Sequence, residues 1–113
     1  MRAAAGLAAW LLASCAAGPP KPDPTWLDDP LYARHERAVA DFQRTRDHGV
    51  GDPAWRCDDL CRASDEACQT AGALCTQAGP GRRCDDARRG CSWTHTLLPR
   101  ACAYCAPPPA TPP

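Results

Sequence analysis

Cysteine is the residue type in this chain that is most able to do chemistry. The sequence of 113 residues contains nine cysteines, and eight of them fall in the segment from Cys57 to Cys105. Thiolates bind soft metal ions and attack disulfides, whereas paired cysteines only cross-link the chain. Which of these applies depends on the secondary structure that carries the cysteines and on the compartment of the protein.

Cys102-Ala103-Tyr104-Cys105 has the CxxC spacing of thiol oxidoreductases and of half a zinc site. A redox motif of this kind belongs beside a βαβ unit, and no strand-like alternation surrounds it here. Ser92 and His95 are three residues apart, but no orienting acid accompanies them as a hydrolase would require. We therefore predict no enzymatic activity and no cofactor.

Metal binding by thiolates is the alternative that the sequence leaves open. Cysteines on the inner face of a helical bundle suit Cu(I) or Zn(II), and His95 lies on the same stripe between Cys91 and Cys102. Thiols outside the cytoplasm are usually oxidised, which favours disulfides over a metal site.

The spacing of the eight cysteines predicts two helices that face each other. At about 100° per residue, four of them share one stripe of a first helix and four share one stripe of a second helix. The stripes are Cys57, Cys61, Cys68 and Cys75, then Cys84, Cys91, Cys102 and Cys105. A short turn at 78–81 would join the helices as an antiparallel hairpin with sulfur facing sulfur.

The register of such a hairpin restricts the disulfide pairing. Opposite residues in an antiparallel pair have residue numbers that add to a constant total, which Cys75–Cys84 and Cys68–Cys91 share. The outer cysteines are out of register with the inner pairs if the second helix is straight. Pro99 lies where that helix would have to be distorted for them to pair. The favoured pairs are Cys75–Cys84, Cys68–Cys91, Cys61–Cys102 and Cys57–Cys105. The rival keeps Cys57–Cys102 in register and pairs Cys61 with Cys105.

Three helices are expected in all, and the second and third form this hairpin. Asp29-Pro30 and Asp52-Pro53 each place a capping carboxylate before a proline at the first helical position. The predicted helices run from 30 to about 48, from 54 to 77, and from 82 to 98, with a last short turn over 99–105. The first helix should cover one side of the hairpin with an apolar face made of Leu31, His35, Ala38, Val39 and Phe42. The fold class is therefore all-α.

The amino terminus has the layout of a secretory signal: Met1-Arg2, then an apolar run. The 15 residues from 3 to 17 span roughly 22 Å of helix, too short to cross a bilayer. Leu12-Ala13-Ser14-Cys15 resembles the lipobox of bacterial lipoproteins. That resemblance implies cleavage after Ser14, lipidation of Cys15 and acylation of the new amino terminus. Eight cysteines then remain, an even number.

The resemblance and the composition together predict five segments. These are a signal peptide at 1–14, a lipidated cysteine with a proline-rich spacer at 15–24, an amphipathic helix at 25–51, a cysteine-rich hairpin at 52–106 and a proline-rich tail at 107–113. A polyproline conformation would let the spacer hold the body about 25–30 Å from the bilayer. Both proline-rich segments are expected to be disordered.

Few large apolar residues are available to build a core. The segment 52–106 contains no Val, Ile, Phe or Met, and disulfides worth about 2–4 kcal/mol each commonly compensate in small exported domains. Lys and Arg number 13, as do Asp and Glu; without a net positive charge, nucleic acid is not an expected partner. The hairpin is similar to twin-Cys hairpins and to small cysteine-rich bacterial lipoproteins of unknown role, but it lacks CX9C spacing and inherits no function.

We expect an exported, lipid-anchored envelope protein with a binding or structural role. Its predicted partners are the membrane, through the anchor, and an envelope protein. Ala16 follows the lipidated cysteine, and by analogy with Gram-negative lipoproteins this favours the outer membrane. Trp55 and Trp93 are candidate partner contacts, because Trp is enriched at binding hot spots; packing over the thin core is the alternative role for both.

Overall fold

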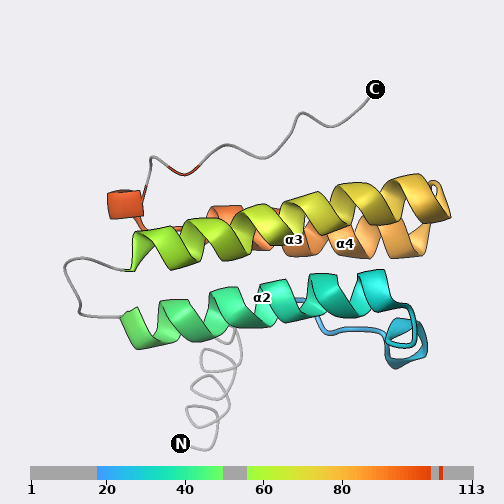
Figure 1. Ribbon diagram of the computed structural model, residues 1–113, viewed down its shortest axis with the longest axis horizontal. Helices are drawn as coiled ribbons and strands as arrows, with labels where there is room; N and C mark the ends of the chain where they lie inside the picture. Colours follow the sequence, from blue (N-terminus) through green and yellow to red (C-terminus); the bar gives the residue numbers. More distant parts are fainter. Residues whose placement is uncertain (1–17, 50–55, 103–104, 106–113) are drawn as a thin grey trace, which may run out of the picture.

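Three antiparallel helices form the body of the protein. The computed structural model describes residues 18–49, 56–102 and 105 (Figure 1). Its elements are a 3₁₀ helix η1 (Pro24–Trp26), the helices α2 (Pro30–Gly49), α3 (Cys57–Ala78) and α4 (Arg82–Thr96), and a 3₁₀ helix η2 (Arg100–Cys102). Within these ranges there is no strand. The predicted all-α fold, a disulfide-bonded hairpin with one additional N-terminal helix, is confirmed.

The α2 helix begins and ends where its sequence signals lie. Asp29 Oδ1 accepts a hydrogen bond from the Leu31 N–H at 2.9 Å, and Pro30 takes the first helical position, where its missing N–H costs nothing. Arg46 and His48 lie in the last turn, where cationic side chains interact favourably with the helix dipole. The predicted bounds of this helix are therefore confirmed.

The α3 helix begins later than the sequence suggested. Arg56 has a left-handed backbone (φ 49°, ψ 47°) that interrupts a helix, so α3 starts at Cys57 and not at Ala54. The proposed start signal at Asp52-Pro53 lies outside the described residues. At the other end, Gly79 adopts a positive φ of 73° and its N–H donates to the Cys75 carbonyl, a conformation that glycine adopts without a Cβ penalty.

The α4 helix ends at Thr96, two residues before the predicted end at Leu98. Leu97 has left the α-helical region with φ −97° and ψ 1°. Pro99 restricts the residue before it to extended conformations, which explains the early end. The chain then forms η2, the last turn that the sequence predicted.

Small residues bring the helices close together, and aromatic residues fill the two ends of the core. Tyr32, not Leu31, occupies the first buried position of α2, while His35, Ala38, Val39 and Phe42 are buried as predicted. Ala67, Ala71 and Ala87 line the middle of the bundle. Phe42 packs edge-to-face on Trp93, with ring centroids 5.8 Å apart. Leu60 and Leu74 are fully buried.

Both inner disulfides join α3 to α4 as the register predicted. Cys75 pairs with Cys84 across the turn, and Cys68 pairs with Cys91, with Cα–Cα distances of 4.5 and 4.6 Å. Because these residues face each other at matched heights, the two helices need not deform to meet disulfide geometry.

The outer pairing is a correction. The structure joins Cys57 to Cys102 and Cys61 to Cys105, both at a Cα–Cα distance of 5.3 Å, in place of the favoured Cys61–Cys102 and Cys57–Cys105. Cys102 keeps the register of the inner pairs and lies opposite Cys57. After the end of η2, the Cys105 N–H donates to the Cys102 carbonyl at 3.1 Å. Because α4 ends at Thr96, Cys105 does not continue that helix and can lie beside Cys61.

The proline-rich segment before η1 lies along the bundle. Pro19, Pro20 and Pro22 line a groove on α2, and the Asp23 N–H donates to the Tyr32 hydroxyl at 3.2 Å. In Figure 1 this blue segment runs back from η1 behind α2. Residues 18–23 therefore do not extend away from the body as a free spacer would.

No helix in the described part of the chain is long and apolar enough to span a membrane. The predicted signal peptide at 1–14, the lipidation site Cys15 and the tail at 107–113 lie outside the described residues, and so does Trp55.

Candidate functional site

A strongly charged concave surface lies between the N-terminal segment and the first turns of α4. It is a hollow of about 630 Å³ whose lining combines three cationic side chains, three carboxylates and one indole ring. The lining residues are Lys21, Asp23, Pro24, Trp26, Arg82, Asp85, Asp86 and Arg89. We call this surface the α4 hollow.

Local sequence explains how one wall of the α4 hollow is held. Asp23 caps η1: its Oδ1 accepts hydrogen bonds from the Thr25 N–H at 2.9 Å and from the Thr25 hydroxyl at 2.6 Å. Pro24 occupies the first position of the 3₁₀ helix. Trp26 follows in that turn and packs edge-to-face on Tyr32, with ring centroids 5.5 Å apart. The indole is thereby fixed beside α4.

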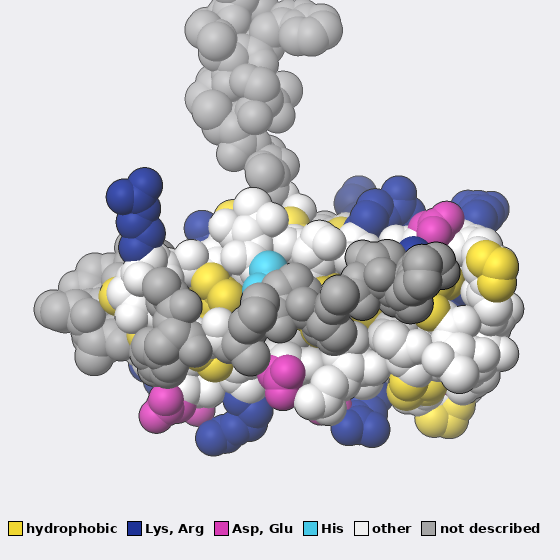
Figure 2. All heavy atoms as spheres, turned by 90° about the horizontal axis from the view of Figure 1, so that it is seen from above, with side chains coloured by type: hydrophobic (Ala, Val, Ile, Leu, Met, Phe, Trp, Pro, Cys, Tyr) yellow, Lys and Arg dark blue, Asp and Glu magenta, His cyan; other side chains and the backbone are white. Residues whose placement is uncertain are grey.

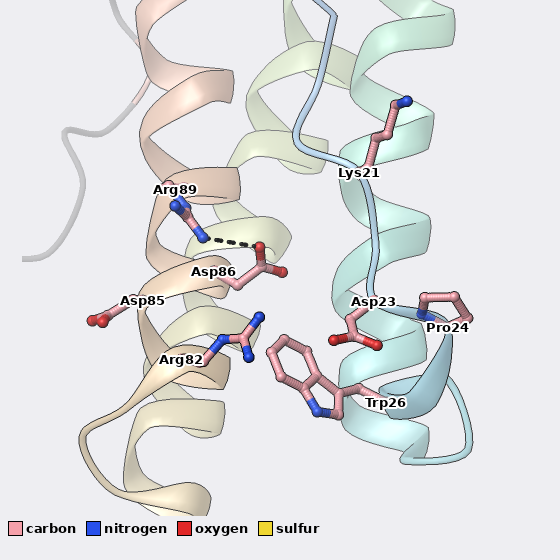
Figure 3. A pocket seen from close by; sticks show the side chains of 8 residues that line it. All are labelled: Lys21, Asp23, Pro24, Trp26, Arg82, Asp85, Asp86 and Arg89. Carbon is pink, nitrogen blue, oxygen red and sulfur yellow. Dashed lines mark hydrogen bonds and ion pairs between the residues drawn. The ribbon is translucent and has the colours of Figure 1, made fainter.

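The opposite wall consists of one face of α4. Arg82, Asp86 and Arg89 follow one another at intervals of one helical turn. Asp86 Oδ1 forms an ion pair with the Arg89 guanidinium at 3.3 Å. Figure 3 shows the Arg82 guanidinium and the Asp86 carboxylate pointing toward Trp26 and Asp23, while Asp85 points away. The second oxygen of Asp86 accepts the Tyr32 hydroxyl at 2.7 Å.

Tyr32 connects the two walls from beneath. Its hydroxyl donates to Asp86 on α4 and accepts the backbone N–H of Asp23. Burial, followed by its carboxylate neighbours, raises the pKa of the Tyr32 hydroxyl far above its ordinary value, so the group stays protonated. One buried phenol thus fixes the spacing between the N-terminal segment and α4.

A further arginine, Arg83, lies at the rim of the α4 hollow. Arg83 lies 5.5 Å from the centroid of the Trp26 ring and donates to Asp29 Oδ2 at 3.2 Å. The pKa of Asp23 is lowered, first by its hydrogen bonds from Thr25 and further by the positive charge of Arg82 and Arg83. Lys21 and Arg82 themselves form no ion pair or hydrogen bond within the described part of the chain.

Such a lining can bind a ligand that carries both anionic and cationic groups. Lys21 and Arg82 are available to phosphate or carboxylate, and the Asp23 carboxylate, which faces Trp26 in Figure 3, is available to an ammonium group. The Trp26 ring offers a flat apolar surface between them. The lining contains no Ser, Cys or His that would serve as a nucleophile or base near neutral pH.

On one face of the molecule, charged side chains are dispersed. Figure 2 shows Lys and Arg side chains along both long edges of one face, with hydrophobic side chains in small separate patches. Of the large hydrophobic residues that the structure describes, Leu27 is the exposed one, with 43 % of its surface accessible.

No protein-family model, curated protein or solved structure matches this chain.

The other candidate residues are placed as follows. Cys102 and Cys105 belong to two different disulfides, so the CxxC segment is not a redox pair. Trp93 is half-buried against Phe42, which corresponds to its packing role. His95 is half-buried and its pKa is lowered by burial, while Ser92 is exposed.

All eight cysteines from Cys57 to Cys105 are paired, so they offer no thiolate to a soft metal ion in this state. Within residues 18–49, 56–102 and 105, no three side chains of His, Cys, Asp or Glu are grouped as a metal site would need.

The sequence did not lead us to predict the α4 hollow. Its signal was present, because Asp23-Pro24 repeats the Asp-Pro device that marks the start of α2 at Asp29-Pro30. Reading it as a cap would have ended the proline-rich spacer at residue 23 and placed Trp26 in a structured turn.

Proposed function

We propose that this chain is a lipid-anchored protein of the bacterial envelope, attached through Cys15, which acts by binding and not by catalysis. One observation carries the anchoring: the eight cysteines of the bundle pair among themselves and leave Cys15 as the odd residue. Together with the lipobox-like Leu12-Ala13-Ser14-Cys15, this supports a thioether to a lipid at that sulfur.

The disulfides also support export. Four disulfides in so small a chain are typical of an oxidising compartment and are rare in the cytosol. Ala16 after the lipidated cysteine favours the outer membrane of a Gram-negative cell, by analogy with known lipoproteins. Two or more acyl chains on Cys15 would make the attachment stable, since one chain alone binds only marginally.

The binding role is supported by the α4 hollow. Its cations and carboxylates surround an indole ring that is rigidly held, and rigid Trp and Arg side chains are typical binding hot spots. An envelope protein that presents a salt-bridging segment would fit this lining.

A Cys15→Ser variant tests the anchor. We expect the wild-type protein in the membrane fraction and the variant in the soluble fraction, with the acyl mass missing from the intact mass of the variant. The circular dichroism spectrum and the absence of free thiols should be the same in both, which shows that the bundle is intact. Retention of a folded variant in the membrane fraction would refute lipid anchoring.

A photo-crosslinking amino acid tests the binding role. Placed at Trp26, it should give discrete adducts with a protein partner in cells, and Arg82→Ala should abolish them. The matched control places the same amino acid at Arg88, which is exposed on α4 outside the hollow. Adducts at position 88 that equal those at position 26, or adducts at 26 that survive Arg82→Ala, would count against the hollow as the binding surface.

A further inference from the structure

The proline-rich segment fixes where the chain leaves the bundle. Pro19 and Pro20 lie in the groove with Ala40 and Gln43, residues in the middle of α2. Asp23, at the other end of the segment, is held by Tyr32 through the 3.2 Å hydrogen bond. The chain therefore meets the body at the flank of α2, halfway along its length, and not at one end of the bundle.

The distance from this point to Cys15 is short. Only Ala16 and Ala17 separate Cys15 from Gly18, and three residues span at most about 10–11 Å even when fully extended. The α2 helix, with 20 residues, is about 30 Å long. A tether so short, attached at the middle of so long a side, cannot hold the bundle upright on one end.

We propose that the bundle lies on its side against the phospholipid bilayer, with the α2 groove that Pro19, Pro20, Pro22 and Leu27 line facing the lipid headgroups. This inference rests on the proposed lipidation of Cys15. It replaces the free spacer that the proline content suggested, because the prolines are used to dock the segment and not to extend it.

The chemistry of this surface suits a bilayer. Leu27, the exposed large hydrophobic residue, lies in the same groove as Pro19, Pro20 and Pro22, so the apolar side chains gather near the tether. Lys21 and Arg37 are exposed beside them and form no ion pair within the described ranges. Lysine and arginine bind phosphate oxygens, and apolar side chains enter the headgroup boundary.

A single lysine makes the orientation measurable. Lys21 is the single lysine among the 13 Lys and Arg residues of this sequence, and the others are arginines. Arg62→Lys adds a second lysine in the groove on the other side of α2, where the Arg62 side chain is 79 % exposed. The two amines then report on opposite sides of the same helix.

The experiment labels the lipidated Arg62→Lys protein with a membrane-impermeant amine reagent in vesicles of phosphatidylethanolamine and phosphatidylglycerol. The reference is the soluble Cys15→Ser form of the same variant at equal concentration. Mass spectrometry of peptides gives the rate at each lysine. We expect the ratio of the Lys21 rate to the rate at position 62 to fall at least about fivefold on vesicles.

An unchanged ratio would overturn the side-on orientation, whether both amines stay accessible, both are protected equally, or a second copy already covers Lys21 in the soluble form. Failure of the anchor itself looks different, because the protein with Cys15 would then lack the acyl mass, or the Cys15→Ser form would remain in the membrane fraction, whatever the ratio.

Discussion

His35 on α2 and Gly90 on α4 meet so closely that no larger residue fits at position 90: a Cβ atom built there would lie 2.7 Å from His35 Nε2. Both residues are buried. On its other side, His35 Nδ1 lies 3.0 Å from the Ala67 carbonyl and 2.9 Å from Thr70 Oγ1. The carbonyl only accepts, and the Thr70 hydroxyl donates to backbone carbonyls, so we assign the proton to Nδ1. Nε2 is buried without a hydrogen-bond partner among the described residues.

Gly90→Ala should destabilise the protein, although alanine is the better helix former. The new methyl group would press on His35 and, at 3.2 Å, on Val39, and overpacking of this kind costs about 1–3 kcal/mol. Urea unfolding followed by circular dichroism measures the change.

The matched control is Gly72→Ala. Gly72 is exposed on α3, and a Cβ atom there would have open space. This variant should gain about 0.5–1 kcal/mol from the lower backbone entropy of the unfolded chain. Equal stabilisation by both substitutions would show that α2 and α4 do not approach as described.

Stability should fall as the pH drops below neutral, and the fully buried His35 contributes to this loss together with His95, whose pKa is also lowered by burial. Burial lowers the pKa of His35 below its ordinary value of 6.5, opposed by its bond to Ala67 and by the charge of Asp86. The unfolded chain then binds more protons than the folded protein, so the stabilising contribution is complete above the unfolded pKa and is lost as the pH falls through the folded value.

His35→Gln isolates this effect, because glutamine keeps a donor for Ala67 and does not titrate. Glu36 has a pKa raised by burial and changes stability in the opposite direction with pH. The comparison is therefore between the variant and the wild type at each pH from 5 to 8. We expect the wild type to lose more stability than the variant between pH 7 and 5. Parallel curves would contradict the assignment.

Tyr32→Phe should release the N-terminal segment while leaving the bundle folded. The hydroxyl makes two bonds, to Asp23 and to Asp86, and its loss should cost about 1–2 kcal/mol. Hydrogen exchange measured by NMR should become faster at the Asp23 amide and stay unchanged in the middle of α3. An unaltered Asp23 amide would mean that Tyr32 does not hold the segment.

Asp29→Ala should destabilise α2 by about 1–2 kcal/mol through loss of the N-cap. The Asp29 carboxylate also accepts Gln77 Nε2 at 3.0 Å and Arg83 at 3.2 Å, so the variant also loosens the contact of α2 with both other helices. Thermal unfolding measures the loss. Asp28→Ala is the control, expected within about 0.5 kcal/mol of wild type because Asp28 is exposed.

Local signals predicted most of the fold. Asp29-Pro30 and Gly79-Pro80 mark a helix start and a helix end by mechanisms that act within a few residues, and both lie where expected. The inner disulfides followed from register, because helical periodicity alone places Cys68 and Cys75 on one stripe.

The features that periodicity did not predict depend on tertiary contact. Tyr32 is buried, although it is polar at its tip, because Asp86 and the Asp23 backbone satisfy its hydroxyl. The outer disulfides depend on the direction in which the chain turns after Thr96, and helical spacing carries no information about that turn. The α4 hollow needs residues that are about 60 positions apart, which a scan of local motifs does not bring together.

The central claim is that four disulfides in one stated pairing hold this bundle and leave only Cys15 outside it. The most direct test is disulfide mapping of the unreduced, mature protein. Chymotrypsin cleaves after Leu60, Leu74 and Tyr104, and trypsin cleaves after Arg62, Arg83 and Arg89. The two digests together separate each cysteine from its neighbours on the stripe. We predict no free thiols and four linked pairs: Cys57–Cys102, Cys61–Cys105, Cys68–Cys91 and Cys75–Cys84. Free thiols at these positions, or a peptide that links Cys57 to Cys105, would contradict the account.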